Sequence, residues 1–345
     1  MSEAPPVNQG LDLPDVALAD YLERHVAGFR GPLASSKFKG GQSNPTYLID
    51  AASGKYVLRR KPPGQLLASA HAVDREFRVL EALHGSAVPV AEPLHLCSDE
   101  SVIGSMFYLM QYMDGRIFWD PSLPEIATGE RAAYYDALIT TLAALHSLDV
   151  SAVGLSGYGK PGNYFARQIS RWSDQYRASE TQPIPAMDAL IERLPARCPA
   201  DDGVVALVHG DYRIDNLMFH PEQPRIIAVV DWELSTLGHP LADLGYFCMA
   251  LRLPRNPALP GLAGLDRAGL GIPDEASILR RYTELTGRPM PEDWPFVLAF
   301  SFFRLAAIAQ GVAKRSQQGN ASSEKAAQAG QMTALLAETG LRTLG

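Results

Sequence analysis

The stretch LVHGDYRIDNLMFHPEQPRIIAVVDWE, residues 207–233 and here called the opening stretch, decides how this chain is interpreted. Its apolar runs are typical of short β-strands, which we expect near 204–208, 216–219 and 226–230. If the last two strands pair as a hairpin around the turn HPEQP, Asp211 and Asp231 flank the two ends of that hairpin. Asn216 follows Asp211 by five positions, so three oxygen-bearing side chains are expected near one another.

These residue types in this order indicate phosphoryl transfer. A carboxylate and an amide oxygen are hard ligands that suit Mg²⁺, which takes one or two protein carboxylates together with substrate phosphates, so Asn216 and Asp231 are candidate magnesium ligands. Asp211 can then accept the proton of a hydroxyl group that attacks phosphorus, as in the His-x-Asp, four residues, Asn template. The alternative for each residue alone is a turn or helix cap, but the joint order and spacing favour the chemical role.

The segments LVHGDYRIDNLMF and AVVDWELSTLGHPLADLGY resemble the aminoglycoside phosphotransferase family of small-molecule kinases, over roughly residues 33–315. The resemblance implies an α+β, bilobal protein-kinase-like fold with a small β-rich N-lobe and a larger, mainly helical C-lobe. It implies ATP and Mg²⁺ as cofactors, with Asp211 as catalytic base. His209 is expected to brace the loop. Asp243 matches a family Asp that buttresses this loop, although a carboxylate at a helix start explains it nearly as well.

The predicted elements divide the chain into a nucleotide-binding lobe, residues 1–113, and a catalytic and acceptor lobe, residues 114–345. The first has a helix within 14–26, strands near 33–39, 45–50 and 55–60, a helix within 69–85 and two strands within 88–115. Beside the three strands of the opening stretch, the second has helices within 130–148 and 163–179 and near 240–251, 275–286, 293–316 and 322–340.

A kinase needs a cation on the ATP phosphates and an acid that holds this cation in place. Arg59 in YVLRRK falls where the family has its strand cation, and Glu76 lies on the following predicted helix. Arg60 or Lys61 could be the true contact, because neighbours on a strand point to opposite faces and the register is open. A solvated strand charge is the alternative for Arg59 alone.

Two further segments complete the predicted nucleotide site. KGGQSNPTY stands where family members have a Gly-rich turn over the phosphates, which makes Gly41, Ser43 and Asn44 candidate cofactor contacts, while an ordinary hairpin turn explains the glycines equally well. In YLMQYMDG an apolar strand runs into a Gly at the expected linker. Backbone groups of Gln111 and Met113 are expected to pair with adenine, and a plain edge strand is the alternative.

The acceptor is expected to be a small molecule with a hydroxyl group. The formal charge of −7 argues against nucleic acid as a partner. Residues 251–320 hold nine Arg or Lys against six acids, a local excess of three positive charges that favours an anionic or neutral acceptor. VLRRKPPG, HPLADLGY and FFRLAAIAQGVAKR look most like the branch related to the kinase-like domain of acyl-CoA dehydrogenase fusion proteins, which suggests a hydroxyacyl or CoA-linked acceptor. Arg304 and Arg315 are candidate substrate contacts, with ordinary helix-surface arginines as the alternative.

The remaining features predict a cytoplasmic protein with no membrane partner. The amino terminus is polar, and we expect no apolar membrane span. Cys97, Cys198 and Cys248 are far apart and are expected to be reduced core residues. The oligomeric state is left open.

Three functions fit the motifs: an ATP-dependent small-molecule O-kinase, a catalytically silent nucleotide-binding regulatory module, and a metal-dependent phosphohydrolase without ATP. Retention of both Asp211 and Asp231 speaks against the silent module. The β-rich half, which carries a cation and a helical Glu, speaks against the hydrolase. The kinase is therefore the predicted function.

Overall fold

The computed structural model describes residues 12–38, 44–62, 72–256, 259–315 and 323–345, with the side chains of 323–330 excepted. Its contacts divide the chain into two compact units. The first comprises Met1–Arg116, Phe219–Pro221 and Ile227–Glu233, and the second comprises Ile117–Met218, Glu222–Ile226 and Leu234–Gly345. Residues of the opening stretch therefore belong to both units.

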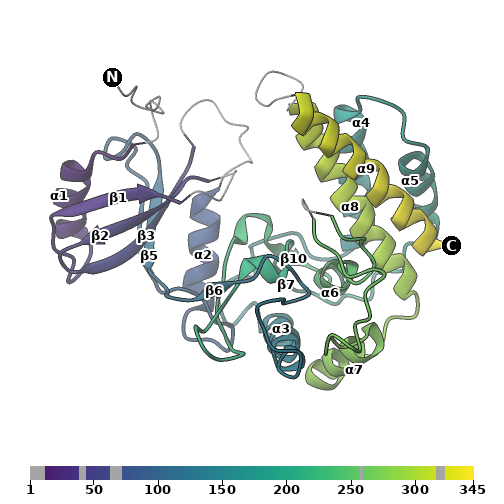
Figure 1. The fold of residues 1–345 in the computed structure, drawn as a ribbon. Coiled ribbons are helices and arrows are strands. Elements are labelled where there is room, and N and C mark those ends of the chain that lie inside the picture. Colours follow the sequence, from purple (N-terminus) through teal and green to yellow (C-terminus); the bar gives the residue numbers. More distant parts are fainter. Residues whose placement is uncertain (1–11, 39–43, 63–71, 257–258, 316–322) are drawn as a thin grey trace, which may run out of the picture. The chain divides into compact units, whose positions relative to one another are not determined.

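The first unit is built on an antiparallel sheet (Figure 1). Its elements are α1 (Asp15–His25), β1 (Leu33–Lys37), β2 (Thr46–Ala51), β3 (Gly54–Arg60), α2 (Val73–Leu83), β4 (Pro93–Cys97) and β5 (Phe107–Gln111). The strand order is β1-β2-β3-β5-β4, and every neighbouring pair runs antiparallel. The predicted order of strands and helices in this part of the chain is confirmed.

The two helices of this unit pack on opposite faces of the sheet. Leu18 and Leu22 of α1 share one buried cluster with alternate strand residues such as Ile49. On the other face, Phe77 of α2 lies with its ring 5.8 Å from that of Tyr108. Because successive side chains on a strand alternate between faces, this arrangement fixes which strand residues meet α2.

The second unit is mainly helical. Its helices are α3 (Arg131–His146), α4 (Tyr164–Ser179), α5 (Pro185–Arg197), α6 (Leu241–Met249), α7 (Glu275–Thr286), α8 (Trp294–Arg315) and α9 (Ser323–Leu344). Strands β7 (Ala206–Val208) and β10 (Thr236–Gly238) pair antiparallel. One large core joins residues of α4, α5, α6, α8 and α9, and Figure 1 shows α8 and α9 side by side.

Three short strands form a separate sheet in the order β6 (Arg116–Ile117), β8 (Leu217–Phe219) and β9 (Ile226–Val229). The division into units passes through each of these strands. β8 and β9 are hydrogen-bonded neighbours, so the hairpin predicted between them is confirmed. Turns of 3₁₀ helix, η1 (Ile214–Asn216) and η2 (Trp232–Leu234), adjoin β8 and follow β9.

The structure differs from the sequence prediction at a few places. The sequence reasoning missed β6, β10 and α5; α5 has Pro185 at its start and Pro195 inside it, two residues that usually indicate a boundary. The last helix continues to Leu344, four residues beyond its predicted end at 340. The cysteines are free thiols, but Cys198 is only half-buried and is not a core residue.

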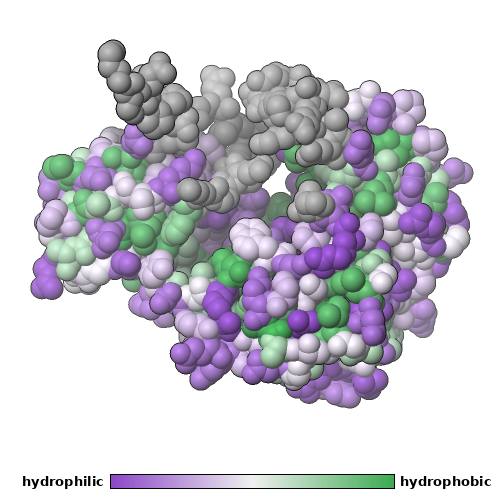
Figure 2. All heavy atoms as spheres, in the orientation of Figure 1, coloured by the Kyte–Doolittle hydropathy of each residue, from purple (hydrophilic) through white to green (hydrophobic). Residues whose placement is uncertain are grey.

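Helix α8 is long and apolar enough to cross a membrane by length and composition alone. However, 72% of its most apolar window is buried inside the structure, where it packs among the other helices of its unit. Figure 2 shows hydrophobic residues on the visible face as small patches among hydrophilic ones. The apolar character of α8 is therefore explained by its place in the core.

Candidate active site

The predicted catalytic loop follows β7 in the second unit. Gly210 has a φ of +85°, a conformation that L side chains rarely adopt. A Cβ atom at this position would lie 2.5 Å from the carbonyl oxygen of Leu234. Glycine is thus required here both by the backbone conformation and by the close approach of a second segment.

A buried carboxylate stabilises the catalytic loop by accepting hydrogen bonds from its backbone. The side chain of Asp243, in the first turn of α6, is inaccessible to solvent. Its oxygens accept hydrogen bonds from the backbone N–H of His209 (2.6 Å) and of Gly210 (2.8 Å). The ring of His209 accepts a bond from the backbone N–H of Asp211 (3.1 Å), so this His braces the loop.

His146 of α3 completes this arrangement, which we call the Asp243 network: Asp243, His209, Gly210, His146 and Tyr282. His146 Nε2 lies 3.3 Å from Asp243, and its Nδ1 lies 2.8 Å from the hydroxyl of Tyr282. Burial lowers the pKa of His146 despite its contact with Asp243. The ring is therefore neutral, with Nε2–H donating to the carboxylate and Nδ1 accepting from Tyr282.

The pKa of Asp243 is shifted in the same direction. Burial opposes its ionisation, but the hydrogen bond from His146 and the donors of the loop outweigh burial and hold its pKa below the ordinary value. Asp243 is thus an ionised carboxylate that neutral donors surround.

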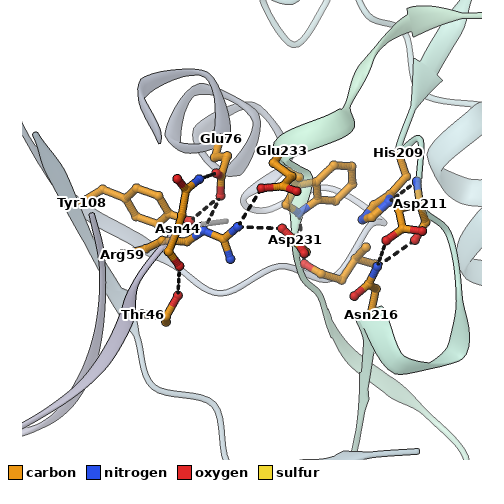
Figure 3. Close-up of polar contacts among 12 residues, drawn as sticks. Asn44, Thr46, Arg59, Glu76, Tyr108, His209, Asp211, Asn216, Asp231 and Glu233 are labelled. Atoms are coloured by element: carbon orange, nitrogen blue, oxygen red, sulfur yellow. Dashed lines mark hydrogen bonds and ion pairs between the residues drawn. The ribbon is translucent and has the colours of Figure 1, made fainter. Parts of the chain in front are cut away.

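Asp211 and Asn216 are brought together in the second unit (Figure 3). The side-chain amide of Asn216 donates to Asp211 twice, to its backbone oxygen (2.8 Å) and to its Oδ2 (2.9 Å). The amide oxygen of Asn216 accepts none of the hydrogen bonds found among the described residues. This orientation leaves a hard oxygen ligand available for a metal ion.

Arg213 pairs with two carboxylates of the same loop. Its Nε lies 3.1 Å from Asp211 Oδ1, and its Nη2 lies 3.1 Å from Asp215 Oδ2. The Arg213 side chain is 32% exposed, whereas those of Asp211 and Asp215 are 20% and 15% exposed. One oxygen of Asp211 thus accepts a hydrogen bond from Asn216, and the other forms an ion pair with Arg213.

The first unit holds a second polar group, the Arg59 cluster, defined as Arg59, Glu76, Asp231 and Glu233 (Figure 3). Arg59 Nε lies 2.9 Å from Glu76, and its Nη2 lies 2.7 Å from Asp231 and 3.7 Å from Glu233. Arg60 points to the other face of β3, where its Nε donates to Ser105 (2.8 Å). The structure thus settles the strand register in favour of Arg59 as the partner of the helical Glu.

Glu76 is held by donors besides Arg59. The side-chain amide of Asn44 donates to it at 2.6 Å, and the hydroxyl of Tyr108 donates at 3.1 Å. Burial raises the pKa of Glu76 to about 7, and the nearby carboxylates of Asp231 and Glu233 add to this shift against the opposing effect of Arg59. The Arg59 cluster therefore holds more carboxylates than cations.

Asp231 is the second residue after β9 and has a φ of +66°, in the left-handed region that non-glycine residues rarely adopt. Such strain often accompanies functional positions, and here it aims the carboxylate at Arg59. Asp231 belongs to the first unit, whereas Asp211 and Asn216 belong to the second.

The other predicted nucleotide contacts have mixed outcomes. Gly41 and Ser43 lie outside the described residues. Asn44 is fully buried and supports Glu76. The backbone N–H of Gln111 already donates to the carbonyl of Glu92 (2.9 Å), and Met113 is half-buried just after β5. Pairing of this segment with adenine stays a prediction.

The candidate substrate arginines differ in their surroundings. Arg304 is 4% exposed, and its guanidinium lies 5.7 Å from the ring of Trp172 and 5.6 Å from that of Tyr246. Arg315 is exposed near the end of α8. Of the cations counted in 251–320, Arg255 and Arg281 pair with Asp120 and Asp136, which lie outside that segment, so the sequence count overstates the local positive charge.

A cavity of about 290 Å³ lies in the second unit beside the loop. Its walls are mainly apolar, with Trp119, Tyr135, Phe247 and Leu253 among them, and Arg213 and Asp215 supply charge. Trp119 is 69% exposed. Tyr246 also lines this cavity, and burial together with Asp211 raises its pKa. We call this the loop cavity.

Among the described residues, no group of three or more His, Cys, Asp or Glu side chains is arranged to hold a metal ion. This donor set does not suit a closed protein cage. It fits a magnesium ion that takes only one or two protein ligands and completes its shell with phosphate oxygens.

Sequence reasoning missed five residues that belong to these groups: Glu233, Tyr108, Arg213, His146 and Tyr282. Glu233 stands two positions after Asp231, and Arg213 stands two positions after Asp211. Both charges were visible within the opening stretch. Tyr108, His146 and Tyr282 gave no comparable signal, since their partners are remote in sequence.

Comparison with known proteins identifies the family of this chain. The sequence profile of the phosphotransferase enzyme family matches residues 35–278. The chain belongs to this family. This phosphotransferase has the α+β, bilobal protein-kinase-like fold.

Curated relatives are longer than this phosphotransferase. It is 48% identical over 335 residues to acyl-CoA dehydrogenase family member 10 of Mus musculus, covering 96% of this chain and 31% of the relative. It is 46% identical over 350 residues to the probable acyl-CoA dehydrogenase IBR3 of Arabidopsis thaliana, covering 94% and 42%. The chain thus spans about a third to two fifths of the length of these relatives, and the predicted branch of the family is confirmed.

Solved structures share the fold. A candidate aminoglycoside phosphotransferase from Ralstonia eutropha JMP134 is 50% identical, with a TM-score of 0.88 over 96% of this chain and 98% of that one. A thermostable mutant of aminoglycoside phosphotransferase APH(4)-Ia, in a complex with AMP-PNP and hygromycin B, is 18% identical with a TM-score of 0.61 over 94% and 98%. At that identity the likeness concerns the fold alone.

Proposed function

We propose that this phosphotransferase moves the γ-phosphoryl group of ATP, with Mg²⁺, to a hydroxyl group of a small molecule. The orientation of Asn216 toward Asp211 carries the proposal. Its amide nitrogen holds the base, and its amide oxygen remains for a metal ion. Membership of the phosphotransferase family supports the reaction class.

Each charged residue has a role in this reaction. Asp211 accepts the proton of the acceptor hydroxyl, since the loop fixes its carboxylate from both sides. Asn216 and Asp231 would hold magnesium, which when bound supplies positive charge between the phosphates. Arg59, positioned by Glu76, would contact the ATP phosphates.

We further propose a hydroxyacyl or CoA-linked acceptor that enters the loop cavity. The cavity walls are mainly apolar, and Asp215, the one acid among the described residues that line it, is already paired with Arg213. A polycationic aminoglycoside would need several unpaired acids here. The names of the curated relatives, which contain acyl-CoA dehydrogenase, support an acyl acceptor.

The test is a screen of hydroxyacyl-CoA thioesters of varied chain length, with Mg-ATP, for a gain in mass of one phosphoryl group. Aminoglycosides serve as the contrasting panel. Asp211→Asn should lower turnover by at least about 10³-fold while the Kd for Mg-ATP stays within about 3-fold, because only the base is removed. Unchanged turnover in this variant would remove Asp211 from the role of base.

Thermal melting separates the alternative functions. A kinase or a silent nucleotide-binding module melts at a higher temperature with Mg-ATP, because a ligand that binds only the folded state stabilises it, whereas a phosphohydrolase that does not use ATP shows no shift. Turnover then separates the kinase from the silent module. Absence of any ATP-dependent shift would contradict the proposal.

A further inference from the structure

We propose that a second cavity of the second unit binds a small carboxylic acid with an apolar body, whose carboxylate pairs with Arg288. This cavity, which we call the Arg288 cavity, has a volume of about 590 Å³. None of the described residues that line it also lines the loop cavity. Small-molecule sites usually measure about 300–1,000 Å³, so the Arg288 cavity is large enough for a ligand of its own.

The walls of the Arg288 cavity come from four parts of the second unit: the start of α4, the segment after α5, the start of α6 and the segment that leads from α7 into α8. Most of the wall side chains are apolar, among them Phe165, Leu241, Pro289 and Met290. Such walls favour a ligand with an apolar body, because its binding removes apolar surface from water.

Arg288 is a half-buried cation for which the described residues supply no anionic partner. Its Nη2 donates to the backbone oxygen of His146 (3.0 Å), and this is the one hydrogen bond of its side chain among the described residues. Its Nε is inaccessible to solvent and has no hydrogen-bond partner. A guanidinium has five N–H donors and a charge that is costly to bury unpaired, so Arg288 favours an anion in the cavity that it lines.

Four other charged or titratable side chains of the cavity are already paired. Arg197 lies 2.7 Å from Asp293, and His239 Nε2 lies 3.2 Å from Asp202. Burial lowers the pKa of His239 despite this contact, and its Nδ1 accepts from the backbone N–H of Leu241 (3.3 Å). The ring is therefore neutral, and Arg288 is the cation that remains for a ligand.

A single unpaired cation favours a ligand with one negative charge. The planar fork of Arg288 matches the two oxygens of a carboxylate. The remaining acids of the walls, Asp201 and Glu292, are exposed, so water and salt screen their effect on a single charge at Arg288. They would still disfavour a polyanion such as a nucleotide or a CoA thioester. A free carboxylic acid with an apolar body is the class of ligand that this cavity fits.

The competing explanation is that Arg288 only caps α3, since His146 is the last residue of that helix, and that the cavity is a plain apolar space. The two explanations differ in how binding depends on charge. An apolar space binds octanoate and its neutral counterpart octanamide equally well, whereas a carboxylate site prefers octanoate.

The experiment measures the Kd of octanoate and of octanamide by titration calorimetry for the native chain, Arg288→Gln and Arg288→Lys. The native chain should bind octanoate at least about 10-fold more tightly than octanamide, the worth of one charge-assisted contact. Arg288→Gln should lose about 10- to 100-fold in octanoate affinity and keep its octanamide affinity within about 3-fold. Arg288→Lys should retain part of the preference, since it keeps the charge without the fork. Arg281→Gln is the matched control, because Arg281 forms an exposed pair with Asp136 (2.7 Å).

Cys198 reports where the ligand binds, because it lines the Arg288 cavity and is half-buried, whereas Cys97 and Cys248 are buried. Octanoate should slow the alkylation of Cys198 by N-ethylmaleimide in the native chain, followed by mass spectrometry of peptides, and should have no such effect in Arg288→Gln. Trp119→Ala, which changes a wall of the loop cavity, should leave the octanoate affinity unchanged.

Equal affinity of the native chain for octanoate and octanamide would overturn the proposal and leave Arg288 as a helix cap. Absence of octanoate binding at millimolar concentration would overturn it as well. If Trp119→Ala weakens octanoate binding and Arg288→Gln does not, the ligand lies in the loop cavity and the proposal fails. None of these measurements requires phosphoryl transfer, so a failure of the proposed function would leave their outcome unaffected.

Discussion

The Arg59 cluster and the Asp243 network both bury carboxylates, yet they compensate the buried charge in different ways. In the Arg59 cluster, one guanidinium faces the three acids Glu76, Asp231 and Glu233. In the Asp243 network, a single carboxylate accepts from two backbone N–H groups and a neutral His. The first has an excess of negative charge, and the second has every oxygen satisfied by neutral donors.

This difference indicates which of the two groups needs no further ion and which one can bind a further cation. A network of neutral donors around one carboxylate is rigid and needs no further ion. Burial, with a further contribution from the excess of carboxylates, raises the pKa of Glu76, and a divalent cation at Asp231 would offset this excess of negative charge. We therefore expect the Asp243 network to govern stability and the Arg59 cluster to govern nucleotide binding.

The largest expected effect comes from removing Asp243. Asp243→Ala leaves two buried backbone N–H groups and the ring of His146 without their acceptor. We expect the free energy of unfolding of the second unit to fall by about 3–5 kcal/mol, measured by urea unfolding. Asp243→Asn keeps one acceptor oxygen and should fall between the native chain and the alanine variant. An alanine variant as stable as the native chain would show that the network is not what holds this loop.

A smaller and more specific effect is expected from Arg59. Arg59→Met removes the cation that three carboxylates share, and it should weaken binding of Mg-ATP by about 10- to 100-fold, the worth of one charge-assisted contact. Arg60→Met is the matched control: this neighbouring arginine is buried, but it bonds Ser105 on the other face of β3. Titration calorimetry with Mg-ATP measures both. Equal losses in the two variants would contradict the assignment of Arg59.

Most of the fold could be predicted because local signals agree with the final structure. The range 275–286 was predicted for a helix, and α7 spans those residues, with Asp274 capping its start through Ser277 N–H (2.8 Å) and Gly287 at its end with a φ of +67°. Helix α5 was missed because Pro195 lies inside it, where tertiary packing overrides a local helix breaker.

The candidate site was predictable only where its residues are close in sequence. Asp211 and Asn216 are five positions apart, and a motif captures them. Arg59 and Asp231 are 172 positions apart, and their ion pair depends on how the chain folds. The same limit explains why the charge count over 251–320 overstates the local positive charge, because Arg281 is neutralised by Asp136, 145 positions away. The net charge counted along a segment of the sequence therefore does not give the local charge in the folded structure.

The smallest expected effect concerns how stability depends on pH. The contributions of Glu76 and His146 to stability should change with pH in opposite directions. The pKa of Glu76 is raised from 4.5 to about 7, so the folded chain binds this proton more tightly than the unfolded chain, and the contribution of Glu76 to stability is lost as the pH rises from 4.5 through 7. The pKa of His146 is lowered from 6.5, so its contribution is lost as the pH falls below 6.5. Each slope is at most about 1.4 kcal/mol per pH unit.

The two slopes can be separated by one substitution in each group. Glu76→Gln should flatten the decline of stability between pH 5 and 7, and His146→Gln, whose amide can still donate to Asp243 and accept from Tyr282, should flatten the loss below pH 6.5. Hydrogen exchange in urea, followed in peptides from β3 and from α3, reads each unit separately. Slopes of the same sign in the two units would show that Glu76 is ionised throughout this range, and the Arg59 cluster would then have no need of a further cation.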